Sequence, residues 1–167
     1  MKANILALLF FSLGILLYKV IHDNSSNIEF KEEFAVDPNE LKSINTGITF
    51  IDIFLNNLIV GIMLSYMGFF TGGVLTAILL IFNGFFVSTI YGYGIHFMPF
   101  MDILYYSKHV PIELIALFLF SKIGFSGYGF MKNILSGKEM DMDLLPRVRE
   151  LMIPSLLLFF ASIIEVL

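Results

Sequence analysis

The feature that most constrains this chain is an apolar stretch over residues 50–93. It is about twice the roughly 20 residues that one membrane crossing requires. Because lipid offers the backbone no hydrogen-bond partners, such a stretch must fold into helices that turn back on themselves. Glycine permits turn geometry without a steric penalty, and three glycines lie near the middle: Gly68, Gly72 and Gly73. We therefore expect two spans, at residues 50–67 and 72–93, joined as a tight hairpin.

The composition points to the same class of protein. Of 167 residues, 57% are apolar and only 14% are charged, whereas about 25% of a typical soluble domain is charged. The mean hydropathy is +0.86. A net charge of −4 offers no basic surface for nucleic acid, and the lack of cysteine excludes disulfides and thiolate metal ligands.

Three further apolar runs predict three more spans, at residues 3–21, 110–130 and 151–167. The first run ends in bulky residues, including Tyr18 and Lys19, rather than in the small residues of a cleavage site, so we expect a retained span and not a signal peptide. The predicted fold is all-α, a polytopic membrane bundle of about five transmembrane helices in a single integral membrane domain, residues 1–167.

Two segments that are less uniformly apolar separate the predicted spans, at residues 23–47 and 94–109. Within the polar segment 23–47, Asp37, Pro38 and Glu40 form a helix start signal. Apolar residues follow it at helical spacing: Leu41, Ile44, Ile48, Ile51 and Leu55. We expect a short interfacial helix here, with a solvated linker as the alternative. Residues 94–109 contain glycine and proline among aromatic residues, and we interpret them as an interfacial or re-entrant segment.

The distribution of basic residues predicts the orientation. Lys132, Lys138, Arg147 and Arg149 lie in or at the loop over residues 132–149, and the positive-inside rule assigns that loop to the cytoplasm. With five crossings, the N-terminus is then cytoplasmic, the C-terminus lies outside, and the acidic segment 23–47 also lies outside.

Polar side chains within the spans are the candidate functional residues. A charge at bilayer depth costs roughly 2.5 kcal/mol or more unless it is paired or hydrated. His109 and Glu113 are four residues apart and share one helical face, and Glu165 falls near the same predicted surface. Three amides need partners on neighbouring helices: Asn56, Asn57 and Asn83.

We expect no metal, cofactor or catalytic activity. His109, Glu113, Glu165, His96 and Asp102 could gather near the outer face, but no HExxH motif or cysteine pair accompanies them. The membrane-embedded serines lack a nucleophile context. The expected role of His109 and Glu113 is a structural hydrogen-bonded pair that holds the fourth span against the fifth or the hairpin.

Several motifs, taken in order, resemble the stage II sporulation protein M family of bacterial and archaeal membrane proteins. They are Asn56-Asn57, the bend at Gly68, Gly72 and Gly73, Asn83-Gly84, His109-Val110-Pro111-Ile112-Glu113-Leu114, Gly124 and Ile164-Glu165. The resemblance covers roughly residue 48 to the C-terminus. Family members usually have glycine after the histidine, where this chain has Val110, so the backbone there is less open than in a typical member.

The resemblance implies a non-enzymatic component of the bacterial inner membrane that works with other membrane proteins. The sporulation member is similar to a scaffold for cell-wall remodelling enzymes, whereas relatives accompany transport ATPases or occur with peptide bacteriocins. One function is to anchor partner proteins, and the alternative is to form the membrane-spanning subunit of an ATP-driven exporter. The small residues that allow close helix approach also allow a homo-oligomer.

A candidate docking stripe for a cytoplasmic ATPase lies before the last span. It comprises Leu144, Leu145 and Val148, with Arg147 and Arg149 beside it. A helix that rests on the lipid headgroups explains the same pattern equally well.

Overall fold

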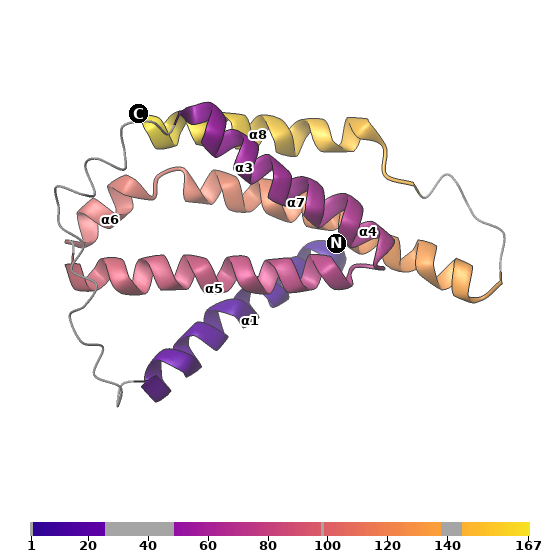
Figure 1. Ribbon diagram of the computed structural model, residues 1–167, viewed down its shortest axis with the longest axis horizontal. Helices are drawn as coiled ribbons and strands as arrows, with labels where there is room; N and C mark the ends of the chain where they lie inside the picture. Colours follow the sequence, from indigo (N-terminus) through magenta and orange to yellow (C-terminus); the bar gives the residue numbers. More distant parts are fainter. Residues whose placement is uncertain (1, 26–48, 98, 138–144) are drawn as a thin grey trace.

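The computed structural model describes residues 2–25, 49–97, 99–137 and 145–167, and these ranges are helical apart from short connections. Figure 1 shows the helices as a bundle. In chain order they are α1 (Lys2–Ser25), α3 (Phe50–Ile62), the π-helix η1 (Met63–Met67), α4 (Gly68–Phe70), α5 (Val74–Phe97), α6 (Phe100–Tyr106), α7 (Val110–Leu135) and α8 (Val148–Val166). The prediction of an all-α membrane bundle is confirmed.

Four of the described helical segments are long and apolar enough to cross a membrane: Ala3–Asp23, Phe50–Phe70, Val74–His96 and Val110–Leu135. They coincide with the first four predicted spans and extend most of them by a few residues. The fifth predicted span corresponds to α8, a helix of 19 residues, which is not among these four. Charged residues lie near its ends: Arg149, Glu150 and Glu165.

Helix α7 forms the centre of the bundle and contacts α1, α3, α4, η1, α5 and α8. In Figure 1 it lies between α5 on one side and the α3–α8 pair on the other, and α1 crosses obliquely against α5. The core beside α7 is apolar and tightly packed. Leu64, Leu80, Phe120 and Leu158 are all fully buried in it.

Helix α3 begins with a capping box. The Thr49 hydroxyl accepts a hydrogen bond from the Asp52 backbone N–H, and the Asp52 carboxylate accepts one from the Thr49 backbone N–H at 2.8 Å. These bonds satisfy backbone groups that the first helical turn leaves without partners. The predicted interfacial helix, with Asp37 and Glu40, lies outside the described residues, as does most of the polar segment 23–47.

The hairpin turn is shorter than the sequence predicted. Gly68 belongs to the helical segment α4, and the reversal itself occupies residues 71–73. Gly72 and Gly73 have φ angles of 65° and 91°, in the region that favours glycine. Gly68 serves packing instead, because a side chain there would collide with the Thr76 hydroxyl.

The π-helix η1 creates a junction of three helices that the sequence did not reveal. In a π-helix the hydrogen-bond pattern shifts from i→i+4 to i→i+5, and here the Thr76 hydroxyl of α5 donates to the Leu64 carbonyl at 2.8 Å. Gly124 of α7 lies against this bond, and a Cβ atom there would collide with both the Leu64 carbonyl oxygen and the Thr76 hydroxyl. The absence of a side chain at Gly124 lets α7 approach η1.

A second close approach joins α1 to α5. A Cβ atom at Gly84 would collide with the Phe11 carbonyl oxygen, and one at Gly14 would collide with the Ile81 carbonyl oxygen. The sequence singled out Gly84 but not Gly14 as a packing residue. Paired small residues of this kind bring helix backbones together in membrane bundles.

Residues 94–109 are more helical than an irregular re-entrant segment would be. Helix α5 continues to Phe97, and the short helix α6 follows after Pro99. In Figure 1, α6 lies at the end of the bundle between α5 and α7. Helix α7 then begins at Val110, with Pro111 in its first turn. Proline suits this place because a backbone N–H in the first turn has no partner within the helix, so its absence costs nothing.

Candidate functional site

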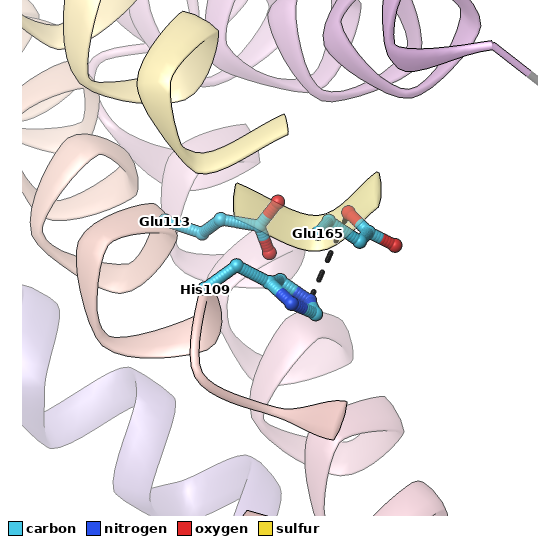
Figure 2. Close-up of side chains that lie close together, drawn as sticks. All are labelled: His109, Glu113 and Glu165. Carbon is cyan, nitrogen blue, oxygen red and sulfur yellow. Dashed lines mark ion pairs between the residues drawn. The ribbon is translucent and has the colours of Figure 1, made fainter. Parts of the chain in front are cut away.

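Polar side chains from three helices meet at the end of the bundle where α6 lies. His109 and Glu113 come from the start of α7, Glu165 from the end of α8 and Asn57 from α3. Figure 2 shows the two α7 side chains beside Glu165. One ligand atom from each of His109, Glu113 and Glu165 lies within 4.8 Å of the others. We call Asn57, His109, Glu113 and Glu165 the polar cluster.

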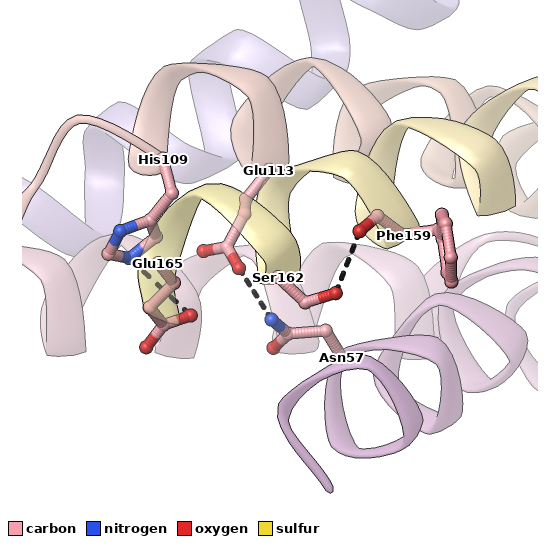
Figure 3. A network of polar contacts seen from close by, with 6 residues as sticks. All are labelled: Asn57, His109, Glu113, Phe159, Ser162 and Glu165. Atoms are coloured by element: carbon pink, nitrogen blue, oxygen red, sulfur yellow. Dashed lines mark hydrogen bonds and ion pairs between the residues drawn. The ribbon is translucent and has the colours of Figure 1, made fainter. Parts of the chain in front are cut away.

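Two contacts hold the polar cluster together, and each joins different helices (Figure 3). The Asn57 amide donates to the Glu113 carboxylate at 2.5 Å. His109 Nε2 lies 3.8 Å from a Glu165 carboxylate oxygen. His109 thus lies beside α8, and Glu113 bonds α3. Among the described residues, no hydrogen bond joins His109 to Glu113 themselves, although the sequence led us to expect such a pair.

Helix geometry explains why these residues converge. His109 is the N-cap of α7 and Glu113 lies in its first turn, so the offset of four residues places both on one face. A carboxylate near a helix N-terminus is favoured by the helix dipole, whereas Glu165, near the C-terminus of α8, is disfavoured. The imidazole of His109 opposite Glu165 offsets that penalty when it is protonated.

The His109 ring is largely enclosed. Its side chain is 13% exposed, compared with 33% for Glu165, and its Nδ1 atom is buried without a hydrogen-bond partner among the described residues. Burial lowers the pKa of His109 below its ordinary value, and the neighbouring Glu165 carboxylate acts in the opposite direction. Burial thus favours the neutral imidazole.

A cavity of about 320 Å³ opens beside the polar cluster. Three of its polar lining residues were named from the sequence as amides needing partners: Asn56, Asn57 and Asn83. A second, more apolar cavity of about 470 Å³ shares His109 and Glu165 with the first and extends toward Tyr106. His109 and Glu165 therefore border both cavities.

The prediction for Asn83 was wrong. Its amide donates at 2.8 Å to the Leu79 carbonyl of its own helix, four residues earlier, and bonds no neighbouring helix within the described part of the chain. A short polar side chain can bond the i−4 carbonyl in this way, as serine and threonine do. Asn56 is exposed and forms no side-chain hydrogen bond with the described residues, so only Asn57 of the three amides links two helices.

The other predicted polar contacts and surfaces differ in outcome. Serines inside the helices bond backbone carbonyls: the Ser65 hydroxyl donates to the Gly61 carbonyl, and the Ser121 hydroxyl donates to the Phe118 carbonyl. Exposed His96 and Asp102 are not part of the polar cluster.

The proposed docking stripe does not form one helix in its described part. Leu145 and Pro146 are not helical, Arg147 is extended, and α8 begins at Val148. Proline disfavours helical conformation in the residue before it, which explains the break. Leu144 lies outside the described residues, and Arg149 is exposed in the first turn of α8. Docking of an ATPase at this place stays a prediction.

The family assignment agrees with this arrangement. Residues 5–167 match the family described as Stage II sporulation protein M. The chain belongs to the stage II sporulation protein M family. No curated protein matches the chain, and no solved structure matches it.

The stage II sporulation protein M match extends the resemblance found in the sequence. That resemblance began near residue 48, whereas the match begins at residue 5 and so includes nearly all of α1. All four residues of the polar cluster fall within the matched region and within the motifs that carried the resemblance. Membership in this family and the long apolar helices both indicate that the chain is a membrane protein.

Proposed function

We propose that this chain is a multi-pass component of the inner membrane that anchors and positions partner proteins and performs no catalysis of its own. The chain belongs to a family that is not known to contain enzymes, and this membership supports a role without catalysis. The apolar helices support the multi-pass arrangement. The basic residues around α8 support an orientation with the hairpin end of the bundle in the cytoplasm and the polar cluster outside.

The observation that carries the proposal is the closed core beneath the polar cluster. The cavity beside the cluster reaches Leu117 and Leu158 at its inner side. Beyond them, Leu64 and Phe120 are fully buried within the same apolar core. Within the described residues, this cavity shares no lining residue with the cavity beside Lys122 and Glu150 nearer the other end, so one copy of the chain shows no continuous polar path between both ends. An anchoring protein needs no such path, whereas a transporter does.

The outward faces of the helices supply surface for partners. On α8, Met152, Ile153, Leu156 and Phe160 are exposed and apolar. In a bilayer such residues contact lipid or the helices of other proteins, and association is driven by packing rather than by exclusion of water. A face of large apolar side chains on the outermost helix suits lateral contact with a partner helix.

Site-specific crosslinking tests the proposal. A photoreactive amino acid at Leu156 or Phe160 faces outward, whereas one at Leu158 points into the core of the same helix and serves as the matched control. We expect defined adducts with another membrane protein from the outward positions in native membranes, and none from Leu158. Adducts with lipid alone at both outward positions would contradict anchoring through α8.

The identity of the captured partner separates anchoring from export. An exporter subunit would be recovered with an ATPase, and ATP hydrolysis would co-purify with the chain in mild detergent. The exposed Val148 and Arg149 at the start of α8 are the described residues at which such an ATPase would contact the chain. Recovery of a stoichiometric ATPase would replace the proposal with the export function.

A further inference from the structure

We propose that the polar cluster binds one divalent metal ion, Zn²⁺, through His109, Glu113 and Glu165. The sequence predicted no metal because no compact ligand motif is present. The structure changes that expectation by bringing together ligands from α7 and α8 that are more than 50 residues apart in the chain. The inference does not rest on the proposed function, since a scaffold or an exporter could each contain such a site.

The spacing of the ligand atoms is the first support. Zn²⁺ binds imidazole nitrogen and carboxylate oxygen at about 2.0–2.2 Å, so atoms that share one ion lie about 3–4 Å apart. His109 Nε2 and the Glu165 oxygen are 3.8 Å apart, which is too long for a hydrogen bond but suits two ligands of one ion. All three residues place a ligand atom within 4.8 Å of the others, so small rotamer adjustments complete the set.

The surroundings of the ligands are the second support. The Asn57 amide bonds one oxygen of Glu113 and thereby orients the carboxylate, as outer-shell groups do in metal sites. His109 Nδ1 is buried without a partner among the described residues. Nε2, the ring nitrogen that faces Glu165, is the atom that would bind the ion, and binding there would fix the orientation of the ring.

Charge is the third support. Glu113 and Glu165 bring two carboxylates to one partly buried place, where their mutual repulsion is unfavourable. Lys108 precedes His109 in the chain, but its ammonium group lies over the Tyr105 ring, 4.5 Å from the ring centroid. A divalent cation among the three ligands would balance both carboxylates.

The ligand types favour zinc over the hard cations. Ca²⁺ and Mg²⁺ prefer oxygen ligands throughout, whereas Zn²⁺ binds both imidazole nitrogen and carboxylate oxygen. The cavity of about 320 Å³ leaves room for a water molecule as a fourth ligand.

Direct metal binding to the whole chain tests this inference. The protein is purified in detergent with an affinity tag that contains no histidine, stripped with a chelator and titrated with ZnCl₂. We expect about one Zn²⁺ per chain after gel filtration, as a site with three protein ligands implies. We expect His109→Ala and Glu165→Gln each to weaken binding at least tenfold.

His96→Ala is the matched control, because His96 is exposed and lies outside the cluster. It should bind Zn²⁺ as the unsubstituted chain does. Equal losses in His96→Ala and His109→Ala, or no binding by a monodisperse chain, would overturn the inference and leave the cluster as a structural ion pair.

Co²⁺ reports coordination directly in the unsubstituted chain, so its spectrum tests the site even where a variant is less stable. Cobalt in a site with four ligands absorbs visible light much more strongly than hexahydrated cobalt. We expect this absorption with the unsubstituted chain, its disappearance with Glu165→Gln and its reversal by added Zn²⁺. A spectrum identical to that of free Co²⁺ would exclude direct coordination by the cluster.

Discussion

The amide of Asn57 in α3 donates a hydrogen bond of 2.5 Å to the carboxylate of Glu113 in α7. The two residues are 56 positions apart in the chain. This bond joins the second predicted span to the fourth, and His109 beside it contacts Glu165 of the fifth. Three helices thus meet through polar groups at one end of a bundle whose core is otherwise mainly apolar, with Ser65, Thr76, Ser121 and Ser162 also buried in it.

Asn57→Ala should lower the free energy of unfolding by about 1–3 kcal/mol, because the partly buried Glu113 carboxylate loses its donor. Asn56→Ala is the matched control, since Asn56 is exposed and forms no side-chain hydrogen bond with the described residues. Thermal unfolding in the same detergent measures both. Equal effects of the two substitutions would show that the bond to Glu113 contributes nothing specific.

His109→Ala and Glu113→Gln should both reduce the amount of protein that accumulates in the membrane, because each weakens a polar contact between spans. Quantitative blotting of membrane fractions measures the amount. If both variants accumulate normally but no longer capture a partner, the cluster has a direct functional role rather than a purely structural one.

Gly124→Ala should destabilise the bundle by about 1–3 kcal/mol, as overpacking of a tight contact does. The added Cβ would collide with the Leu64 carbonyl oxygen, which is backbone and cannot move without shifting η1. Gly129→Ala on the same helix is the control, because nothing lies within 4 Å of its added Cβ. Unfolding midpoints should fall for the first variant and stay unchanged or rise for the second.

Thr76→Val should cost about 1–2 kcal/mol, because the buried Leu64 carbonyl loses the hydroxyl that bonds it. Thr89→Val is the comparison, since among the described residues the Thr89 hydroxyl bonds only the Phe85 carbonyl of its own helix. Unfolding in detergent should separate the two variants. Similar stability of both would contradict the role assigned to the junction of α5 with η1.

The spans were predictable because hydrophobic length is a local property of the sequence. The stretch over residues 50–93 had to fold back, and the turn at Gly72 and Gly73 lies where glycines permit positive φ angles. The π-helix was not predictable, because the Leu64 carbonyl within it bonds Thr76 of another helix. Nothing in the sequence of η1 itself indicates that contact.

The residues of the candidate site were predictable, but their partners were not. Charged and amide side chains are easily recognised within apolar spans. The sequence analysis therefore gave all four residues of the polar cluster as candidates: Asn57, His109, Glu113 and Glu165. The contacts between these groups depend on how each helix is rotated about its own axis. The spacing of apolar residues defines that rotation poorly here, because most helix faces contact lipid and are apolar all round. The error at Asn83 has this origin, because its side chain found a carbonyl within α5 instead of a partner outside it.

The most direct test of the account asks whether the two ends of α7 lie on opposite sides of the membrane. The chain contains no cysteine, so Asp102→Cys near the polar cluster and Ser136→Cys at the other end of α7 can each be labelled alone. A membrane-impermeant maleimide should label Asp102→Cys in intact cells and Ser136→Cys only after the cells are opened. Labelling of both positions from the same side would contradict the account.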